Sequence, residues 1–168
     1  NNANMGFNFA LNALNGSTLA SLEWAYANGN GGNGFNLNLA GAGGVADVLL
    51  NRVGANGNGG SGIQIVENYN GAVGVLGQSL TVTGNTGNGV RLAMSGLGGV
   101  PILDFGGGGD SNGQSSFFGN GNRDFRYNNG GGATVMAENN WWGANLDPVA
   151  NGQTAGSIDA DPWRATAP

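Results

Sequence analysis

The residues of this 168-residue chain that could do acid–base chemistry are few. The chain has ten Asp and Glu residues, five basic residues that are all Arg, and no His. The tightest groups pair Asp104 with Asp110, and place Asp124 beside Arg123 and Arg126. Clustered carboxylates can bind Ca2+ or act as general acid and base. Asp104, Asp110 and Asp124 are therefore the candidate catalytic residues, although turn capping and loop hydrogen bonding is the favoured interpretation of all three.

A second set of residues could bind a carbohydrate. Four polar residues recur at spacings of 27 or 28 residues, namely Asn8, Asn36, Gln64 and Arg91. In addition, Trp24 lies 28 residues before Arg52. A row of amides could donate hydrogen bonds to sugar hydroxyls, and an exposed Trp offers a stacking platform. The alternative is structural, since exposed strand positions are polar, stacked amides hydrogen-bond to each other, and an Arg over a Trp is a cation–π pair.

The composition excludes several classes of function. Without His or Cys there is no zinc site of the usual kind and no Ser/His or Cys/His nucleophilic pair. A net charge of −5 without Lys cannot supply the basic stripe that nucleic-acid binding requires. No apolar stretch approaches the roughly 20 residues of a membrane-spanning helix. We therefore expect no nucleic-acid partner, no membrane span, no cofactor and no metal; one Gly-rich string at 106–110 could bind Ca2+, but it is not iterated as calcium repeats are.

An internal repeat of about 28 residues positions these side chains. Two apolar residues separated by one polar residue recur four times, at Phe7/Phe9, Phe35/Leu37, Ile63/Ile65 and Val90/Leu92. Alternation with a period of 2 is typical of strands with one buried face. We expect these eight side chains to point inward and Asn8, Asn36, Gln64 and Arg91 to point outward.

Two further short runs complete each repeat. One precedes the Gly/Asn turn, at 25–27, 53–55 and 80–82, and a weaker one lies at 18–20, 46–48 and 73–75. Three short strands per repeat, with no helical periodicity between them, predict one coil of a β-solenoid. Successive coils would stack about 4.8 Å apart and bury the apolar columns.

The Asn and Gly residues of the turns also fall in columns. Asn2, Asn30, Asn58 and Asn85 share one column, which Asn112 would extend, and Gly6, Gly34, Gly62 and Gly89 share another. Gly and Asn tolerate the left-handed backbone that a sharp corner demands, and stacked Asn side chains can form a ladder of hydrogen bonds.

After Leu92 the repeat becomes irregular, and the strings at 102–110, 116–125, 137–143 and 158–163 take over. In this order they resemble the C-terminal coils of right-handed parallel β-helix repeat proteins of the pectate-lyase-like superfamily, which includes many bacterial surface and secreted proteins. The resemblance implies an all-β, right-handed parallel β-helix. It does not decide the activity, because the superfamily contains lyases, hydrolases, adhesins and passive scaffolds.

We expect residues 1–143 to form the β-helix and residues 144–168 to form a capping tail, with Trp141, Trp142 and Trp163 folded over the last coil. The first repeat has no comparable cap, so we expect its open strand edge to meet further solenoid or a second molecule stacked along the axis. The function expected is a non-catalytic scaffold or adhesin module, secreted or on a bacterial cell surface. The alternative is a polysaccharide-binding or polysaccharide-degrading domain.

Overall fold

The computed structural model describes residues 2–95, 98–107, 113–128 and 132–168, and every regular element in these ranges is a β-strand. The predicted fold class is confirmed: parallel strands stack into a β-solenoid of about 5 turns with roughly 28-residue spacing. The strands are β1 (Phe7–Glu23), β2 (Phe35–Asn51), β3 (Ile63–Gln78), β4 (Thr81–Thr83), β5 (Val90–Met94), β6 (Ile102–Asp104), β7 (Ser116–Phe118), β8 (Phe125–Asn128), β9 (Val135–Met136), β10 (Thr154–Ala155) and β11 (Ile158–Asp159).

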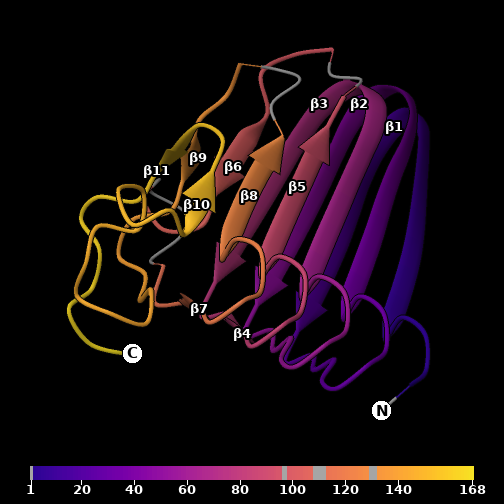
Figure 1. The fold of residues 1–168 in the computed structure, drawn as a ribbon. Helices are drawn as coiled ribbons and strands as arrows, with labels where there is room; N and C mark the ends of the chain where they lie inside the picture. Colours follow the sequence, from indigo (N-terminus) through magenta and orange to yellow (C-terminus); the bar gives the residue numbers. More distant parts are fainter. Residues whose placement is uncertain (1, 96–97, 108–112, 129–131) are drawn as a thin grey trace.

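One side of the solenoid is a continuous parallel sheet in which β1, β2, β3, β5, β8 and β10 lie side by side (Figure 1). Its register pairs Phe7 with Phe35, Phe35 with Ile63, Ile63 with Val90, and Val90 with Phe125. The first three steps repeat the predicted 28-, 28- and 27-residue spacing. The fourth coil is longer, with a sequence separation of 35 between equivalent residues. For this reason the repeat cannot be recognised in the sequence after Leu92.

The coil differs from the prediction in one detail. In the first three coils, two of the three predicted runs belong to one uninterrupted strand of 16 or 17 residues, which pairs along nearly its whole length. The strand changes direction within β2, where Gly41, Gly43 and Gly44 have positive φ and the register to β3 shifts between Ala42 and Val45. Only the third side of the coil is a separate short segment, in which Tyr26 pairs with Gly54 and Gly54 with Thr81.

The apolar columns fill the interior as predicted. Six of the eight expected core residues are fully buried, namely Phe35, Leu37, Ile63, Ile65, Val90 and Leu92. Phe7 and Phe9 continue the same columns, and the Phe7 ring stacks on the Phe35 ring with centroids 5.1 Å apart. Both are nevertheless 43% and 37% exposed, because no coil covers them among the described residues.

The Asn column is a buried ladder. Asn58 illustrates it: its Oδ1 accepts from Nδ2 of Asn30 at 2.9 Å, and its own Nδ2 donates to Oδ1 of Asn85 at 2.9 Å. The next member is Asn120, whose Oδ1 accepts from Nδ2 of Asn85 at 2.8 Å. The predicted member, Asn112, lies outside the described residues; Asn120 takes this place because the fourth coil is longer than the earlier ones.

The Gly column exists for a different reason from the one predicted. A Cβ on Gly34 would lie 2.8 Å from Nδ2 of Asn58, and a Cβ on Gly62 would lie 2.7 Å from Nδ2 of Asn85. These glycines therefore leave room for the ladder and have no left-handed backbone. The left-handed corner falls on another set of glycines, at Gly29, Gly57, Gly84 and Gly119.

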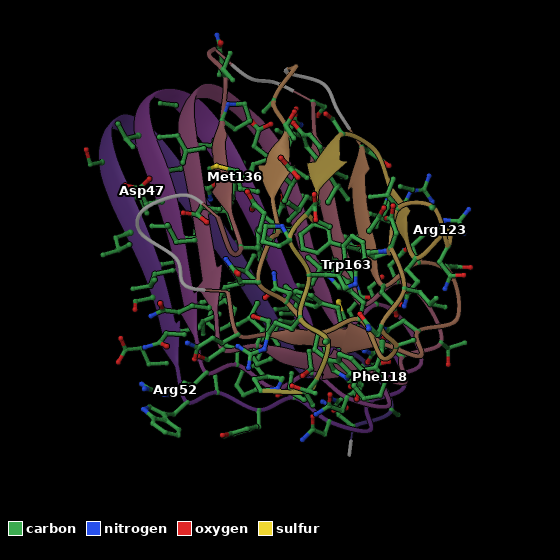
Figure 2. All side chains as sticks on the ribbon, turned by 90° about the vertical axis from the view of Figure 1, so that its left-hand side faces the viewer. Asp47, Arg52, Phe118, Arg123, Met136 and Trp163 are labelled. Carbon is green, nitrogen blue, oxygen red and sulfur yellow. The ribbon has the colours of Figure 1, made fainter. Side chains whose placement is uncertain are left out.

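The two ends of the solenoid are unlike. At the C-terminal end β10 and β11 pair with β8 and β9, Trp142 is fully buried against Phe117, and Trp163 packs on the core. Figure 2 looks onto this end and shows Trp163 near its centre. At the other end β1 pairs only with β2 among the described residues.

Candidate functional site

The candidate catalytic acids are held by hydrogen bonds. Asp124 is buried; its Oδ1 accepts from Nδ2 of Asn120 at 2.7 Å and its Oδ2 from Nε2 of Gln153 at 2.9 Å. Asp104 is also buried and accepts a hydrogen bond from the backbone N–H of Gly106 at 3.0 Å. The Asp104 contact is of the kind that turn capping provides, whereas the Asp124 contacts are side-chain hydrogen bonds, one of which reaches a residue 29 positions away. Asp110 lies outside the described residues, so its relation to Asp104 is not described.

The structure brings Asp104 into the neighbourhood of two acids that the sequence did not group with it. Met136 pairs with Asp104 on one side and with Asp159 on the other, and Glu138 follows two residues later. Burial raises the pKa of Glu138, and the charges of Asp159 and Asp104 raise it further. The sequence could not reveal this grouping because the irregular fourth coil hides the register. Within the described ranges, no set of three or more His, Cys, Asp or Glu residues could hold a metal ion.

A further acid, Glu67, is fully buried inside the solenoid. It takes the core position that Leu39 holds in the preceding coil and Met94 in the following one. Its Oε2 accepts a hydrogen bond from the backbone N–H of Ser95 at 3.1 Å. Tyr127 lies near enough that its pKa is raised, first by burial and then by the charge of Glu67.

The polar residues expected to bind sugars form an outward row along the sheet. Asn36 donates to Oδ1 of Asn8 at 2.8 Å, Gln64 donates to Oδ1 of Asn36 at 3.0 Å, and Arg91 donates to Oε1 of Gln64 at 2.9 Å. Arg126 continues the row in register with Arg91. These donors and acceptors are used in hydrogen bonds between members of the row. Stacking of polar side chains between coils therefore accounts for the regular spacing of the row.

The other expected pair, Trp24 and Arg52, forms an aromatic corner together with Tyr26. The Arg52 guanidinium lies 4.7 Å from the centroid of the Trp24 ring. Trp24 and Tyr26 are 62% and 58% exposed, unlike the buried aromatic residues of the core. The lining of a hollow of about 250 Å³ at this corner consists of Trp24, Tyr26, Arg52, Val53, Ser79 and Thr81.

Backbone conformation positions the corner. Trp24, Arg52 and Ser79 each follow the last residue of a long strand and have φ of 52°, 54° and 53°. The left-handed conformation turns the chain sharply there, so each side chain projects from the edge of the coil. Figure 2 shows Arg52 at one corner and Arg123 on the opposite side of the molecule.

A last candidate surface is the open end of the solenoid, here called the N-terminal face. Its apolar residues are Met5, Phe7 and Phe9, which are 37%, 43% and 37% exposed. Beside them runs the edge of β1 that pairs with no strand in the described part of the chain. An open strand edge beside exposed apolar side chains is a template for a further strand.

No helix among the described residues is long and apolar enough to cross a membrane. Comparisons with protein-family models, with curated proteins and with solved structures found no match to this chain.

Proposed function

We propose that the chain is a non-catalytic structural module that associates with a second copy through its N-terminal face. The observation that carries this proposal is the contrast between the ends. Phe7 and Phe9 extend the buried columns into solvent beside an edge of β1 that no described strand pairs with, whereas Trp142 and Trp163 lie against the core at the other end. Burying such apolar area and pairing such an edge both stabilise association.

The ends also favour one arrangement. The C-terminal end carries β10 and β11 on the sheet and has Trp163 packed on the core. Its apolar interior is therefore less open to a partner than the N-terminal face. A head-to-head dimer, in which two N-terminal faces meet, buries both sets of Phe residues at once and closes after two copies.

A non-catalytic role is supported by the state of the acids. Asp124 is engaged by Asn120 and Gln153, and Asp104 by the turn at Gly106. A secreted or bacterial-surface location, and a relation to the pectate-lyase-like superfamily, remain part of the proposal. They are supported by the composition, which has few charged residues and no Cys, and by the resemblance, which covers residues 7 to about 143 and extends through 158–163.

Sedimentation or light scattering over a concentration series tests the association. The Phe9→Lys variant places a charge on the N-terminal face and should be monomeric at concentrations where the unchanged chain dimerises. The matched control is Leu19→Lys, because Leu19 lies on the same strand and is 66% exposed but belongs to an outward column. A chain that is monomeric throughout, or a Phe9→Lys variant that still dimerises, contradicts the proposal.

The alternative, a polysaccharide-degrading enzyme, is tested separately. We expect no turnover of uronate or neutral polysaccharides, with or without Ca2+. Product formation that disappears in Asp104→Ala, Asp110→Ala or Asp124→Ala would refute the non-catalytic interpretation, provided that each variant retains the circular dichroism spectrum and melting behaviour of the unchanged chain.

A further inference from the structure

We propose that Asn151 is a site of spontaneous covalent modification, at which the side-chain amide is lost and the residue becomes aspartate or isoaspartate. The chain contains twelve Asn–Gly pairs, and this dipeptide favours the reaction because Gly has no side chain to hinder it. The pair formed by Asn151 and Gly152 differs in its hydrogen bonding from the pairs in the coil turns. A modification here concerns the C-terminal end and goes beyond the structural role.

The reaction needs only the Asn–Gly pair and water. The backbone nitrogen of Gly152, after giving its proton to hydroxide, bonds to Cγ of Asn151. Nδ2 then takes a proton from water and leaves as ammonia, which restores the hydroxide and gives a cyclic succinimide. Water breaks either C–N bond of this ring: loss of the bond to Cγ gives aspartate, and loss of the bond to the main-chain carbonyl carbon gives isoaspartate. The Gly N–H must therefore be released before the ring can close.

In the coil turns this N–H group is held between coils. Seven Asn–Gly pairs of the described residues lie in these turns, and in each the Gly N–H donates to a carbonyl of a neighbouring coil at 2.7–3.0 Å: the glycines are Gly29, Gly31, Gly34, Gly57, Gly59, Gly89 and Gly121. Because these bonds belong to the stacking of coils, releasing one N–H group requires two coils to separate locally. Such an opening is rare in well-packed structure.

Asn151 lies in the turn that leads into β10, where the hydrogen bonds are local. The Gly152 N–H donates to the carbonyl of Val149, three residues earlier, at 3.1 Å. Val149 is 52% exposed, so opening this turn uncovers little apolar surface. Asn151 is exposed, and its side chain makes no hydrogen bond within the part of the chain that the structure describes. Both reacting groups are thus more accessible than in the coil turns.

The chain supplies its own matched comparison for Asn151. The tripeptide Ala–Asn–Gly occurs three times, at 27–29, 55–57 and 150–152. Asn28 is exposed, as Asn151 is, but its Oδ1 accepts a hydrogen bond from the backbone N–H of Asn56 at 2.9 Å. Oδ1 of Asn56 accepts in the same way from the backbone N–H of Thr83 at 3.0 Å. Since the local sequence is identical, the hydrogen bonds between coils are the main difference.

Isoaspartate at position 151 alters the C-terminal end of the solenoid. The carbonyl of Gly152 accepts a hydrogen bond from Nη1 of Arg123 at 2.7 Å, and β10 begins two residues later, at Thr154. Isoaspartate adds a carbon atom to the main chain ahead of β10, which displaces Gly152 from Arg123 and weakens the pairing of β10 with β8. The aspartate product keeps the original main chain and adds only a negative charge.

Peptide mapping by tandem mass spectrometry tests the site, using the full chain incubated in mildly alkaline buffer with and without guanidinium. In the folded chain, Asn151 should convert at least about tenfold faster than Asn28 and Asn56, whereas in guanidinium the three rates should agree within about twofold. Aspartate and isoaspartate should both form at position 151, because the succinimide opens either way. Asn151→Gln should remove this conversion, since ring closure from the longer side chain is slower.

Three results would overturn the proposal. They are equal rates at Asn56 and Asn151 in the folded chain, no conversion of folded Asn151 while the denatured chain converts, and aspartate without isoaspartate at position 151. Asn56 lies between two coils, bonded to Asn28 on one side and to Thr83 on the other, so its comparison with Asn151 does not depend on a second copy at the N-terminal face. Repeating the measurement in the Phe9→Lys variant separates the result from the fate of the association proposal.

Discussion

Single positions in the core carry much of the stability of this fold, and Ile65 is the clearest case. It is fully buried between Leu37 and Leu92 of the neighbouring coils. Ile65→Ala should lower the free energy of unfolding by about 2 to 5 kcal/mol, since it leaves a cavity. Chemical denaturation measures this, and Leu19→Ala at a 66% exposed position of β1 should cost less than about 0.5 kcal/mol. Equal costs would show that the Ile65 column is not the core.

The raised pKa of Glu138 gives stability a pH dependence of known sign. Burial and the charges of Asp159 and Asp104 favour protonated Glu138 in the folded chain more than in the unfolded chain. The free energy of unfolding therefore falls as pH rises from the pKa of Glu138 in the unfolded chain to its pKa in the folded chain. Above the folded pKa, the destabilisation by Glu138 is complete.

Glu138→Gln should accordingly raise the melting temperature at neutral pH and leave it unchanged at about pH 3, where the carboxyl is protonated in both states. Glu23→Gln makes the same charge change at an exposed position and is the control. A melting temperature that rises equally in both variants at neutral pH would point to net charge and would exclude a local effect at Glu138.

At the scale of elements, the buried Asn ladder joins the coils at their turns. Asn58 donates to the carbonyl of Ala27 and to Oδ1 of Asn85, and accepts from the backbone and side chain of Asn30. Asn58→Ala leaves several of these buried groups without a partner, each at a cost of about 1–3 kcal/mol. We expect a total loss of at least about 2 kcal/mol in denaturant unfolding.

Asn36→Ala is the matched control for the ladder. Asn36 lies in the outward row, where water can replace the lost hydrogen bonds to Asn8 and Gln64, so its removal should cost less than about 1 kcal/mol. If the two Asn→Ala variants are equally stable, burial of the ladder contributes nothing.

The sequence predicts the first three coils well because each column repeats its residue type. Phe35, Ile63 and Val90 are apolar at spacings of 28 and 27 residues, and side-chain alternation then fixes the register. The irregular coil was not predictable in this way. Asn120 replaces the expected Asn112 because additional residues lengthen the fourth coil. The composition of these residues does not indicate where the strand register resumes.

Candidate-site residues were predictable to a smaller extent. The pairing of Trp24 with Arg52 follows from the 28-residue spacing alone. Tyr26 was missed, although it lies in the middle of the short run at 25–27, because only the packing of its ring on Gly54 distinguishes it from a core aromatic residue. Likewise, a second column of left-handed residues, apart from the glycines at the turns, could not be read from residue type. Its members are Trp24, Arg52, Ser79, Gln114 and Asn139, which are an aromatic residue, a cation, a hydroxyl residue and two amides.

In the whole molecule, the two ends of the solenoid axis differ. A stacked solenoid adds coils by the same contacts that join its own, so an open end is competent for association and a covered end is less so. Figure 1 shows β1 at one edge of the sheet and the C-terminal strands at the other. Under our proposal, two copies of the chain therefore meet through the N-terminal face.

Electron paramagnetic resonance distances between spin labels test this claim most directly. The chain has no Cys, so Leu19→Cys and Leu146→Cys each carry a single nitroxide at an exposed site, near opposite ends of the solenoid. The head-to-head dimer predicts a short, defined distance between two Leu19 labels and a much longer one between two Leu146 labels. A short distance between a Leu19 label on one copy and a Leu146 label on the other, seen only when the two labelled proteins are mixed, would contradict the head-to-head arrangement. The absence of any dipolar coupling between Leu19 labels would contradict it as well.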